Sequence, residues 1–301
     1  MLFCTYNMHY GVGADDRYDV ARIADAVAQA DIVCLQEIVR GWPQLDYTDQ
    51  SREIGTRLNR YFRFHGPMEA DASSVGPDGR IINRRRSFGN TIVSRWPIAW
   101  SRGVMLPKTR LLGAFDLQRG YIEAVVAAPS GPLRIYCTHL SHVGPTTRLP
   151  QVEALMQAIN RAPLTGPTWD MPVDKGHLAL PAIDFPGSSP RDQGFLLREP
   201  VHEVPAAAIV AGDFNFQSTD PEYALICGDP SEAGPRATPL HLVDAWVAAG
   251  NGDQGVDSFP GEGRIDHVFV TSDLTAKVKR AWIDHDTPAS DHWPVFVEFA
   301  D

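Results

Sequence analysis

The chain has 301 residues, of which 44% are hydrophobic and 21% are charged. This balance is ordinary for a globular protein, and a chain of this length can bury a substantial core without disulfides or structural metals. The formal net charge at pH 7 is -10, which disfavours a protein that holds nucleic acid by broad electrostatic attraction. A local basic groove is still compatible with that charge.

The sequence shows no targeting signal and no cysteine pattern that would point to secretion or to a membrane. The sequence starts without a secretory leader pattern, and no apolar run approaches the roughly 20 residues of a membrane span. The four cysteines include no CxxC pair, which disfavours a thiolate zinc site. We therefore expect a cytoplasmic protein with no membrane span.

Short apolar runs that end in polar residues recur along the chain, separated by a few amphipathic segments. They predict strands at 1–7, 31–37, 88–98, 120–129, 133–140, 206–215, 264–271 and 292–300. Apolar residues at helical spacing predict helices at 19–30, 50–62 and 148–160. This mixed order is typical of a layered α/β domain with largely antiparallel sheets and outer helices.

No linker or internal repeat divides the chain, so we expect a single domain over residues 1–301. Two segments, 65–88 and 163–204, resist assignment and predict long loops of functional importance. The first contains Arg84, Arg85 and Arg86; these form either a solvated charged loop or a basic rim that attracts an anionic substrate. The second segment is Pro-rich and contains Trp169, which favours an inserted lid or rim.

Polar side chains of four types stand at the ends of the predicted strands. They are Asn7, Glu37, His139, Asp213, Asn215, Asp266, Asp291 and His292. Each is weak evidence alone, because Asn, Asp and His are frequent in turns. Their joint occurrence is what indicates a site.

The stretch "GDFN" illustrates the two interpretations. If the strand continues, Asp213 and Asn215 point to one side while Phe214 and Phe216 point to the other; otherwise the stretch is an Asx turn. Carboxylate and amide oxygens suit Mg²⁺ or Mn²⁺, and no HExxH, GxSxG or GxxxxGK[ST] motif points elsewhere.

The motifs together resemble the endonuclease/exonuclease/phosphatase superfamily of metal-dependent phosphohydrolases. The resemblance is carried by "TYNMHYG", "IVCLQEI", "GNTIVSRWPI", "YCTHLSH" with "RLPQ" after it, "IVAGDFNFQSTDPEY", "SFPGEGRIDHVFVT" and "SDHWPVFVEF". These motifs extend from residue 5 to residue 299. The resemblance implies a four-layer α/β sandwich of two packed, mostly antiparallel sheets flanked by helices, with the active site at one edge.

The resemblance also implies residue roles. Glu37 is the expected main Mg²⁺ ligand (Mn²⁺ being the alternative), with Asn7 and Asp291 completing or supporting the metal site. Asp213 is expected to align and deprotonate the attacking water. Asn7, Asn215 and His139 would hold phosphoryl oxygens, and His292 would bind the scissile phosphate while Asp266 keeps it cationic.

Three further residues are candidate substrate contacts, namely Asn90, His142 and Arg84, each with an alternative structural interpretation. By contrast, His267 directly follows Asp266 and is expected to point away from the site on a strand. Arg148 and Gln151 in "RLPQ" are interpreted as structural.

Three functions remain compatible with the residues. The first is a Mg²⁺-dependent phosphoesterase, preferentially a phosphodiesterase, for a small-molecule or lipid-derived phosphoester. The second is an endonuclease or exonuclease on DNA or RNA, which would need a basic groove beyond the site. The third is a non-catalytic binding module, which the presence of Glu37, Asp213 and His292 disfavours. No protein partner is predicted.

Overall fold

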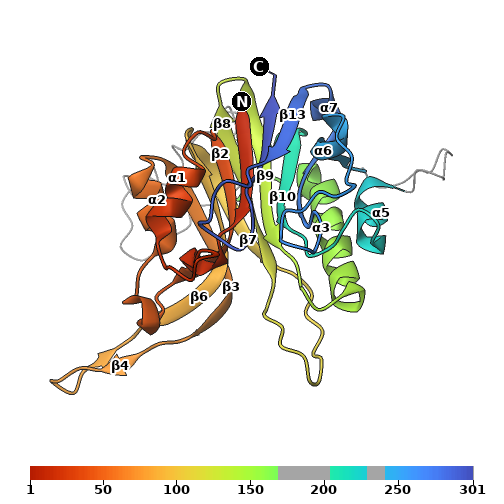
Figure 1. Ribbon diagram of the computed structural model, residues 1–301. Coiled ribbons are helices and arrows are strands. Elements are labelled where there is room, and N and C mark those ends of the chain that lie inside the picture. The colour runs from red at the N-terminus through yellow and green to blue at the C-terminus, as the bar shows by residue number, and fades with distance from the viewer. Residues whose placement is uncertain (169–203, 229–240, 301) are drawn as a thin grey trace, which may run out of the picture.

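Two six-stranded sheets form the centre of the molecule (Figure 1). The computed structural model describes residues 1–168, 204–228 and 241–300. The first sheet has, in spatial order, β13 (Val278–Ile283), β14 (Val295–Phe299), β1 (Leu2–Asn7), β2 (Ile32–Arg40), β6 (Arg85–Ser94) and β3 (Tyr61–Asp71). The second has β11 (Val243–Asp244), β12 (Asp266–Val270), β10 (Ala208–Asp213), β9 (Gly131–His139), β8 (Gly120–Ala128) and β7 (Ile98–Met105).

Helices and one small hairpin complete the described elements. The α-helices are α1 (Val20–Ala26), α2 (Gln50–Arg57), α3 (Pro145–Thr165), α5 (Pro221–Cys227), α6 (Ala245–Ala248) and α7 (Ser272–Thr275); the 3-10 turns are η1 (His9–Gly11) and η2 (Pro43–Leu45). The hairpin pairs β4 (Ser74–Val75) with β5 (Ile81–Ile82). Among the described residues, no helix is both long and apolar enough to cross a membrane.

Strand alternation builds the layers. In β2, Ile32 and Cys34 belong to the core between the two sheets, whereas Val33 and Leu35 pack under the helices on the outer face. The same period of two places Ile209 between the sheets and Val210 beneath α3. Strands buried on both faces read as continuous apolar runs, which is why these segments were predictable.

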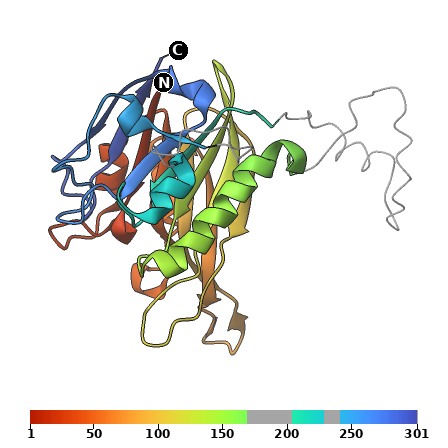
Figure 2. The same cartoon turned by 90° about the vertical axis from the view of Figure 1, so that its right-hand side faces the viewer.

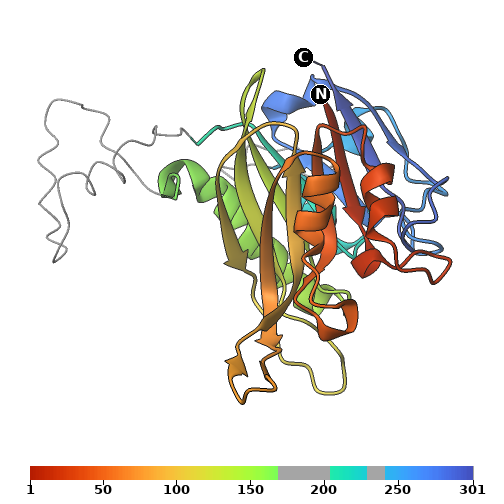
Figure 3. The same cartoon turned by 90° about the vertical axis from the view of Figure 1, so that its left-hand side faces the viewer.

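The helices cover the two outer faces, which gives four layers. Helices α1 and α2 lie over the first sheet (Figure 3), and α3 and α5 lie over the second (Figure 2). The pairs β1–β2 and β9–β10 are parallel, and the other paired strands of the described residues are antiparallel. The predicted four-layer sandwich with mostly antiparallel sheets is confirmed.

The prediction of a loop at 65–88 is wrong in most of its length. Strand β3 continues to Asp71, and β6 already begins at Arg85; only the connection that carries β4 and β5 lies between them. Gly66 and Pro67 fall where the β3–β6 register shifts between His65 and Met68. A bulge on an edge strand tolerates both residue types.

The other predicted loop, 163–204, can be compared with the structure only at its two ends. Helix α3 runs on to Thr165, so the segment 163–204 begins as helix. Residues 169–203, which include Trp169, lie outside the described residues. The lid or rim and the single domain over 1–301 both stay predictions.

Candidate active site

Strand register brings the predicted polar residues to one end of the two sheets. Asn7 is the last residue of β1 and lies opposite Gln36 of β2. On the second sheet, Asp213 is paired with His139 on one side and with Asp266 on the other. Both chain termini lie at the opposite end of the sheets (Figure 1).

Asp213 is the most crowded of these side chains. It is 2% exposed, and its Oδ2 accepts a hydrogen bond from Nδ2 of Asn7 at 2.8 Å and lies 3.3 Å from Nε2 of His139. Burial and the nearby Asp266 carboxylate raise the pKa of Asp213 to about 7. A carboxylate with that pKa can hold a proton near neutral pH.

His292 is paired with a second buried carboxylate. Its Nδ1 lies 2.8 Å from Oδ2 of Asp266, and its Nε2 lies 3.8 Å from Oδ2 of Asp213. Burial lowers the pKa of His292, but Asp266 and then Asp213 more than offset this, and the pKa is raised to about 10. The imidazole is therefore cationic at neutral pH.

Asn7 links the two carboxylates of the site. Its Nδ2 donates to Asp213 and also to Oε1 of Glu37 at 3.3 Å, while its Oδ1 accepts from the backbone N–H of His9. In this orientation, which follows from the hydrogen bonds, the amide oxygen is engaged. Asn7 thus holds the carboxylates of Glu37 and Asp213 in place through hydrogen bonds. Its role as a metal ligand stays a prediction.

Glu37 reaches the site through a backbone irregularity. Its φ is +59°, and the β2–β6 register shifts between Leu35 and Ile38. A non-glycine residue in the left-handed region is strained, and such strain concentrates at functional sites. The bulge turns the Glu37 side chain toward the cavity that it lines, where burial raises its pKa.

Asn215 reaches the same cavity in a different way from the one predicted. Strand β10 ends at Asp213, and Asn215 has φ +55° with its N–H donating to Oδ1 of Asp213. The stretch is therefore an Asx turn and a cavity wall at the same time. Phe214 and Phe216 are buried in the outer core beneath α3 and α5, although the strand whose alternation was expected to place them there ends at Asp213.

His139 is a neutral group with an unused nitrogen. It is 4% exposed, and burial, followed by Arg119, lowers its pKa well below the ordinary value. Its Nδ1 has no hydrogen-bond partner and lies 4.0 Å from Oε1 of Glu37. A buried polar nitrogen without a partner at a cavity wall is a candidate contact for a ligand.

Two groups of residues could hold a cation. Asp213, Asp266 and His292 each offer an atom within 4.8 Å of the others. Glu37 and Asp291 instead line the large cavity together, with Oδ2 of Asp291 lying 3.6 Å from Nδ1 of His9. The oxygens of Glu37 and Asp291 are hard ligands that fit Mg²⁺ or Mn²⁺, and a cation beside Glu37 would offset the cost of burying that carboxylate.

Two cavities meet at the site. The larger has a volume of about 840 Å³ and includes Glu37, His139 and Asp213 in its wall.

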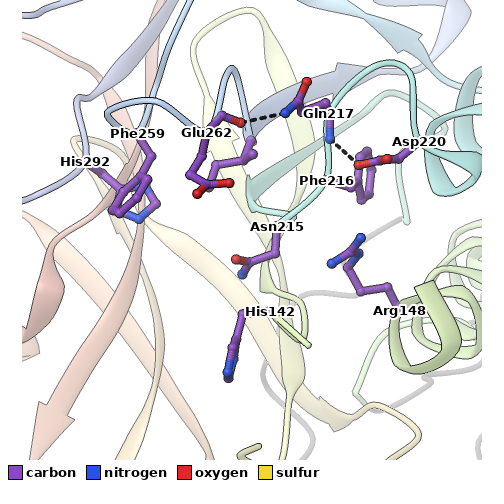
Figure 4. A pocket seen from close by; sticks show the side chains of 10 residues that line it. His142, Arg148, Asn215, Phe216, Gln217, Asp220, Phe259, Glu262 and His292 are labelled. Carbon is purple, nitrogen blue, oxygen red and sulfur yellow. Dashed lines mark hydrogen bonds between the residues drawn. The ribbon is translucent and has the colours of Figure 1, made fainter. Parts of the chain in front are cut away.

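The smaller cavity has a volume of about 430 Å³ and is shown in Figure 4. Arg148 and Asp220 lie on one side of it, and His292 and Phe259 lie on the other. Asn215 and His142 lie between the two sides. The residues common to both walls are His142, Asn215, Phe259 and His292.

Arg119 is a site residue that the sequence reasoning missed. It is 5% exposed, lines the larger cavity, and has Nε and Nη1 without hydrogen-bond partners. Its Nη2 lies 3.3 Å from Nδ1 of His142. The signal in the sequence was slight: an arginine directly before the apolar strand that starts at Gly120.

Of the three further residues predicted to contact the substrate, only His142 lies in a cavity wall. His142 lines both cavities. Asn90 is buried and donates from Nδ2 to the carbonyl of Gly120, and it is in the wall of neither cavity. Arg84 also lies outside both walls, with its guanidinium 4.0 Å from the centre of the Tyr47 ring. The structure therefore does not bring Asn90 or Arg84 into the site.

Three residues interpreted as structural have internal partners. His267 is fully buried, with Nε2 2.8 Å from the carbonyl of Phe216 and Nδ1 2.7 Å from Nη1 of Arg264. Gln151 accepts from the N–H of Ser141. Arg148 pairs with the buried Glu222 at 2.7 Å, although it also lines the smaller cavity.

Comparison with known proteins agrees with this geometry. Residues 4–292 match the model of the Endonuclease/Exonuclease/phosphatase family. The chain therefore belongs to the endonuclease/exonuclease/phosphatase family, whose members are generally hydrolytic phosphoesterases and typically metal-dependent. A comparison with curated protein sequences gives no match.

Solved structures share the fold at low sequence identity. An endonuclease/exonuclease/phosphatase from Beutenbergia cavernae DSM 12333 is 20% identical with a TM-score of 0.61, covering 100% of this chain and 72% of that one. A mannosyl-6-phosphatase from Bacteroides thetaiotaomicron VPI-5482 is 19% identical with a TM-score of 0.57, covering 100% of both chains. A humanized D. rerio TDP2 is 16% identical with a TM-score of 0.51, covering 100% of this chain and 99% of that one.

Proposed function

We propose that this chain is a metal-dependent phosphoesterase that hydrolyses a small-molecule or lipid-derived phosphoester, preferentially a diester, by in-line attack of water. The observation that carries the proposal is the approach of Nε2 of His292 to Oδ2 of Asp213, at 3.8 Å, in the wall of one cavity. Asp213 is a carboxylate that can take a proton near pH 7, and His292 beside it is an imidazole that already holds one. Phosphoester hydrolysis needs both functions.

Asp213 is assigned to the water. Its two oxygens are held by the N–H of Asn215 and by Nδ2 of Asn7, so the carboxylate cannot rotate freely. A fixed base with a pKa near the working pH gives the greatest benefit in general base catalysis. Asp213 therefore aligns a water molecule and accepts its proton as the oxygen attacks phosphorus.

The phosphoryl oxygens are assigned to nitrogen donors around the cavity. His292 offers a cationic imidazole, oriented through Nδ1 by Asp266. Neutral His139 and Arg119 lie in the wall of the larger cavity, and Asn215 lies in both walls. Nε and Nη1 of Arg119 have no hydrogen-bond partner among the described residues. Fixed donors in a site of low dielectric stabilise the charge that develops on those oxygens.

Glu37 and Asp291 are the residues that would hold a divalent cation, with Mg²⁺ preferred over Mn²⁺ and Asn7 in support. Asp266 and His292 are less suited to this role, because their 2.8 Å pairing and the raised pKa of His292 leave that imidazole protonated. When bound, the cation supplies Lewis-acid stabilisation of phosphoryl charge.

Nucleic acid as the substrate has less support. It would require a cationic path that continues beyond the site. In the described part of the chain, Arg84 and Arg86 lie over the rings of Tyr47 and Trp42, and Arg85 pairs with Glu69 at 2.9 Å. The arginines of this segment are thus engaged locally and lie outside both cavity walls.

A substrate panel tests the proposal. The purified protein is assayed with Mg²⁺ against bis-p-nitrophenyl phosphate, p-nitrophenyl phosphate, sphingomyelin, inositol phosphates, RNA and plasmid DNA. We expect hydrolysis of a phosphodiester that is lost with EDTA and in the Asp213→Asn variant. If no phosphoester is hydrolysed, the proposal is refuted. If plasmid DNA is nicked at low enzyme concentration, the nuclease hypothesis is favoured over the small-molecule phosphoesterase.

A further inference from the structure

The larger cavity has both charged and apolar side chains in its wall. Glu37, Arg119 and Asp213, which belong to the proposed reaction site, are among the charged ones. The uncharged residues of the wall are mostly apolar and include Trp42, Leu45, Met68, Phe88, Phe115 and Leu117. At about 840 Å³, it is large enough for an organic group of substantial size.

One of these apolar residues is strongly exposed. Phe115 is 73% exposed, although its side chain contributes to the cavity wall. The loop that carries it, between β7 and β8, projects past the site end of the sheets, as does the β4–β5 hairpin (Figures 1 and 3). When an apolar ligand covers an exposed aromatic ring beside a cavity, apolar surface is removed from water, and this burial favours binding.

The smaller cavity has the opposite character. Arg148, Gln217, Asp220 and Glu262 contribute to its wall, and Figure 4 shows Gln217 hydrogen-bonded to the carbonyl of Glu262 and to the side chain of Asp220. It shares His142, Asn215, Phe259 and His292 with the larger cavity. Two of these, Asn215 and His292, are assigned to the phosphoryl group. The site therefore has an apolar side and a polar side, with the phosphate position between them.

We infer that the substrate is an amphiphilic phosphodiester: its apolar organic arm occupies the larger cavity, and its polar, hydroxyl-bearing arm occupies the smaller one. The inference rests on the proposed phosphoesterase function and adds the chemistry of the two arms. The apolar residues of the larger cavity select the substrate, because their side chains offer no hydrogen-bond partner for the hydroxyl groups of a sugar and no partner for the charges of a polymer backbone.

Two phosphodiesters that share one arm provide the test. Octyl glyceryl phosphate has one apolar and one polar arm, whereas bis(glyceryl) phosphate has two polar arms; phosphorus NMR follows the phosphomonoester product of both. Burying two methylene groups is already enough for about a tenfold effect. We expect kcat/KM to favour octyl glyceryl phosphate by at least about tenfold in the wild-type protein.

Two variants test whether the preference for octyl glyceryl phosphate depends on the apolar residues of the larger cavity. Met68→Gln places a polar group of similar shape in the larger cavity and is expected to reduce the preference severalfold. Phe115→Ser is the second variant, and because Phe115 is largely exposed, its replacement leaves the core intact. The matched control is Met105→Gln, since Met105 is 57% exposed and lies in neither cavity wall; its preference should equal that of the wild type.

The outcomes separate this inference from the proposed function. Hydrolysis of both diesters at equal kcat/KM, or a preference that survives both Met68→Gln and Phe115→Ser, overturns the inference and leaves the phosphoesterase function standing. Failure to hydrolyse either diester, in a preparation that also fails on the whole phosphoester panel, overturns both.

Discussion

Nδ1 of His292 lies 2.8 Å from Oδ2 of Asp266, and the two side chains are 6% and 0% exposed. A buried carboxylate at this distance stabilises the protonated imidazole, and the pKa of His292 is raised to about 10. In the proposed mechanism, the positive charge of His292 that faces the phosphate is therefore a property of the pair, and it depends on Asp266, which lines neither cavity.

Removing the Asp266 charge should shift the pH dependence of the reaction. In Asp266→Asn, the pKa of His292 falls toward its ordinary value of about 6.5, so the imidazole becomes neutral as pH rises past that value. We expect the basic limb of kcat/KM against pH to move down by more than one pH unit. A variant with lower activity but an unmoved basic limb would show that Asp266 only supports the fold.

Glu37→Gln should remove the response to Mg²⁺ while the protein stays folded. The amide keeps the shape of the side chain but offers the cation no charge. We expect activity at saturating Mg²⁺ to equal that in EDTA, with the cation binding measured by calorimetry also lost. The exposed Glu153→Gln on α3 is the matched control, and full Mg²⁺ stimulation in Glu37→Gln would contradict the metal assignment.

Arg119 offers a separate test of phosphate binding. Among the described residues, its buried Nε and Nη1 atoms have no hydrogen-bond partner, although Nε lies 4.0 Å from Oδ1 of Asp116. A hydrogen bond to a charged group contributes about 1.5–3 kcal/mol. Arg119→Met should therefore lower kcat/KM by roughly 10- to 100-fold, and Arg119→Lys should recover part of that loss. Equal losses in both variants, with an unchanged melting temperature, would argue against an anion-binding role.

His267 predicts how stability depends on pH. Burial, followed by Arg264, lowers its pKa from 6.5 to about 4, so between those values the unfolded chain binds a proton that the folded chain does not. The free energy of unfolding therefore decreases as pH falls through this window, by up to about 3 kcal/mol from this residue.

The comparison of His267→Gln with the exposed His285→Gln isolates that contribution. A glutamine at 267 can still donate to the carbonyl of Phe216 and accept from Arg264 but does not titrate. We expect the stability difference between wild type and His267→Gln to shrink or reverse from pH 7 to pH 4.5, with no such trend for His285→Gln. A difference independent of pH would refute the assignment.

The interior of the fold was predictable and its edges were not. The eight predicted strands correspond to the eight interior strands, each buried by a neighbour on both sides. Within the two six-stranded sheets, the four strands that were missed, β3, β7, β11 and β13, are the edges; the small hairpin of β4 and β5 was missed as well. Edge strands are shorter or more polar, and β3 also contains the Gly66–Pro67 bulge, so their sequences lack a continuous apolar signal.

The placement of several candidate site residues at strand ends was predictable for a related reason. Asn7, His139 and Asp213 end interior strands, so their position followed once those strands were recognised. The left-handed backbone of Glu37 and Asn215 could not be read from residue types, because neither residue is glycine. Arg119 was missed because nothing in its sequence neighbourhood distinguishes a cavity-facing arginine from a solvated one.

Asp213→Asn tests the central claim most directly, because it keeps the size of the side chain and removes the carboxylate assigned to the attacking water. The measurement is the steady-state hydrolysis of bis-p-nitrophenyl phosphate at saturating Mg²⁺ by wild type and variant. A general base contributes about 10²–10⁴-fold, so we predict a fall in kcat within that range and little change in KM. A variant that keeps the wild-type kcat, or that loses only affinity, would contradict the account.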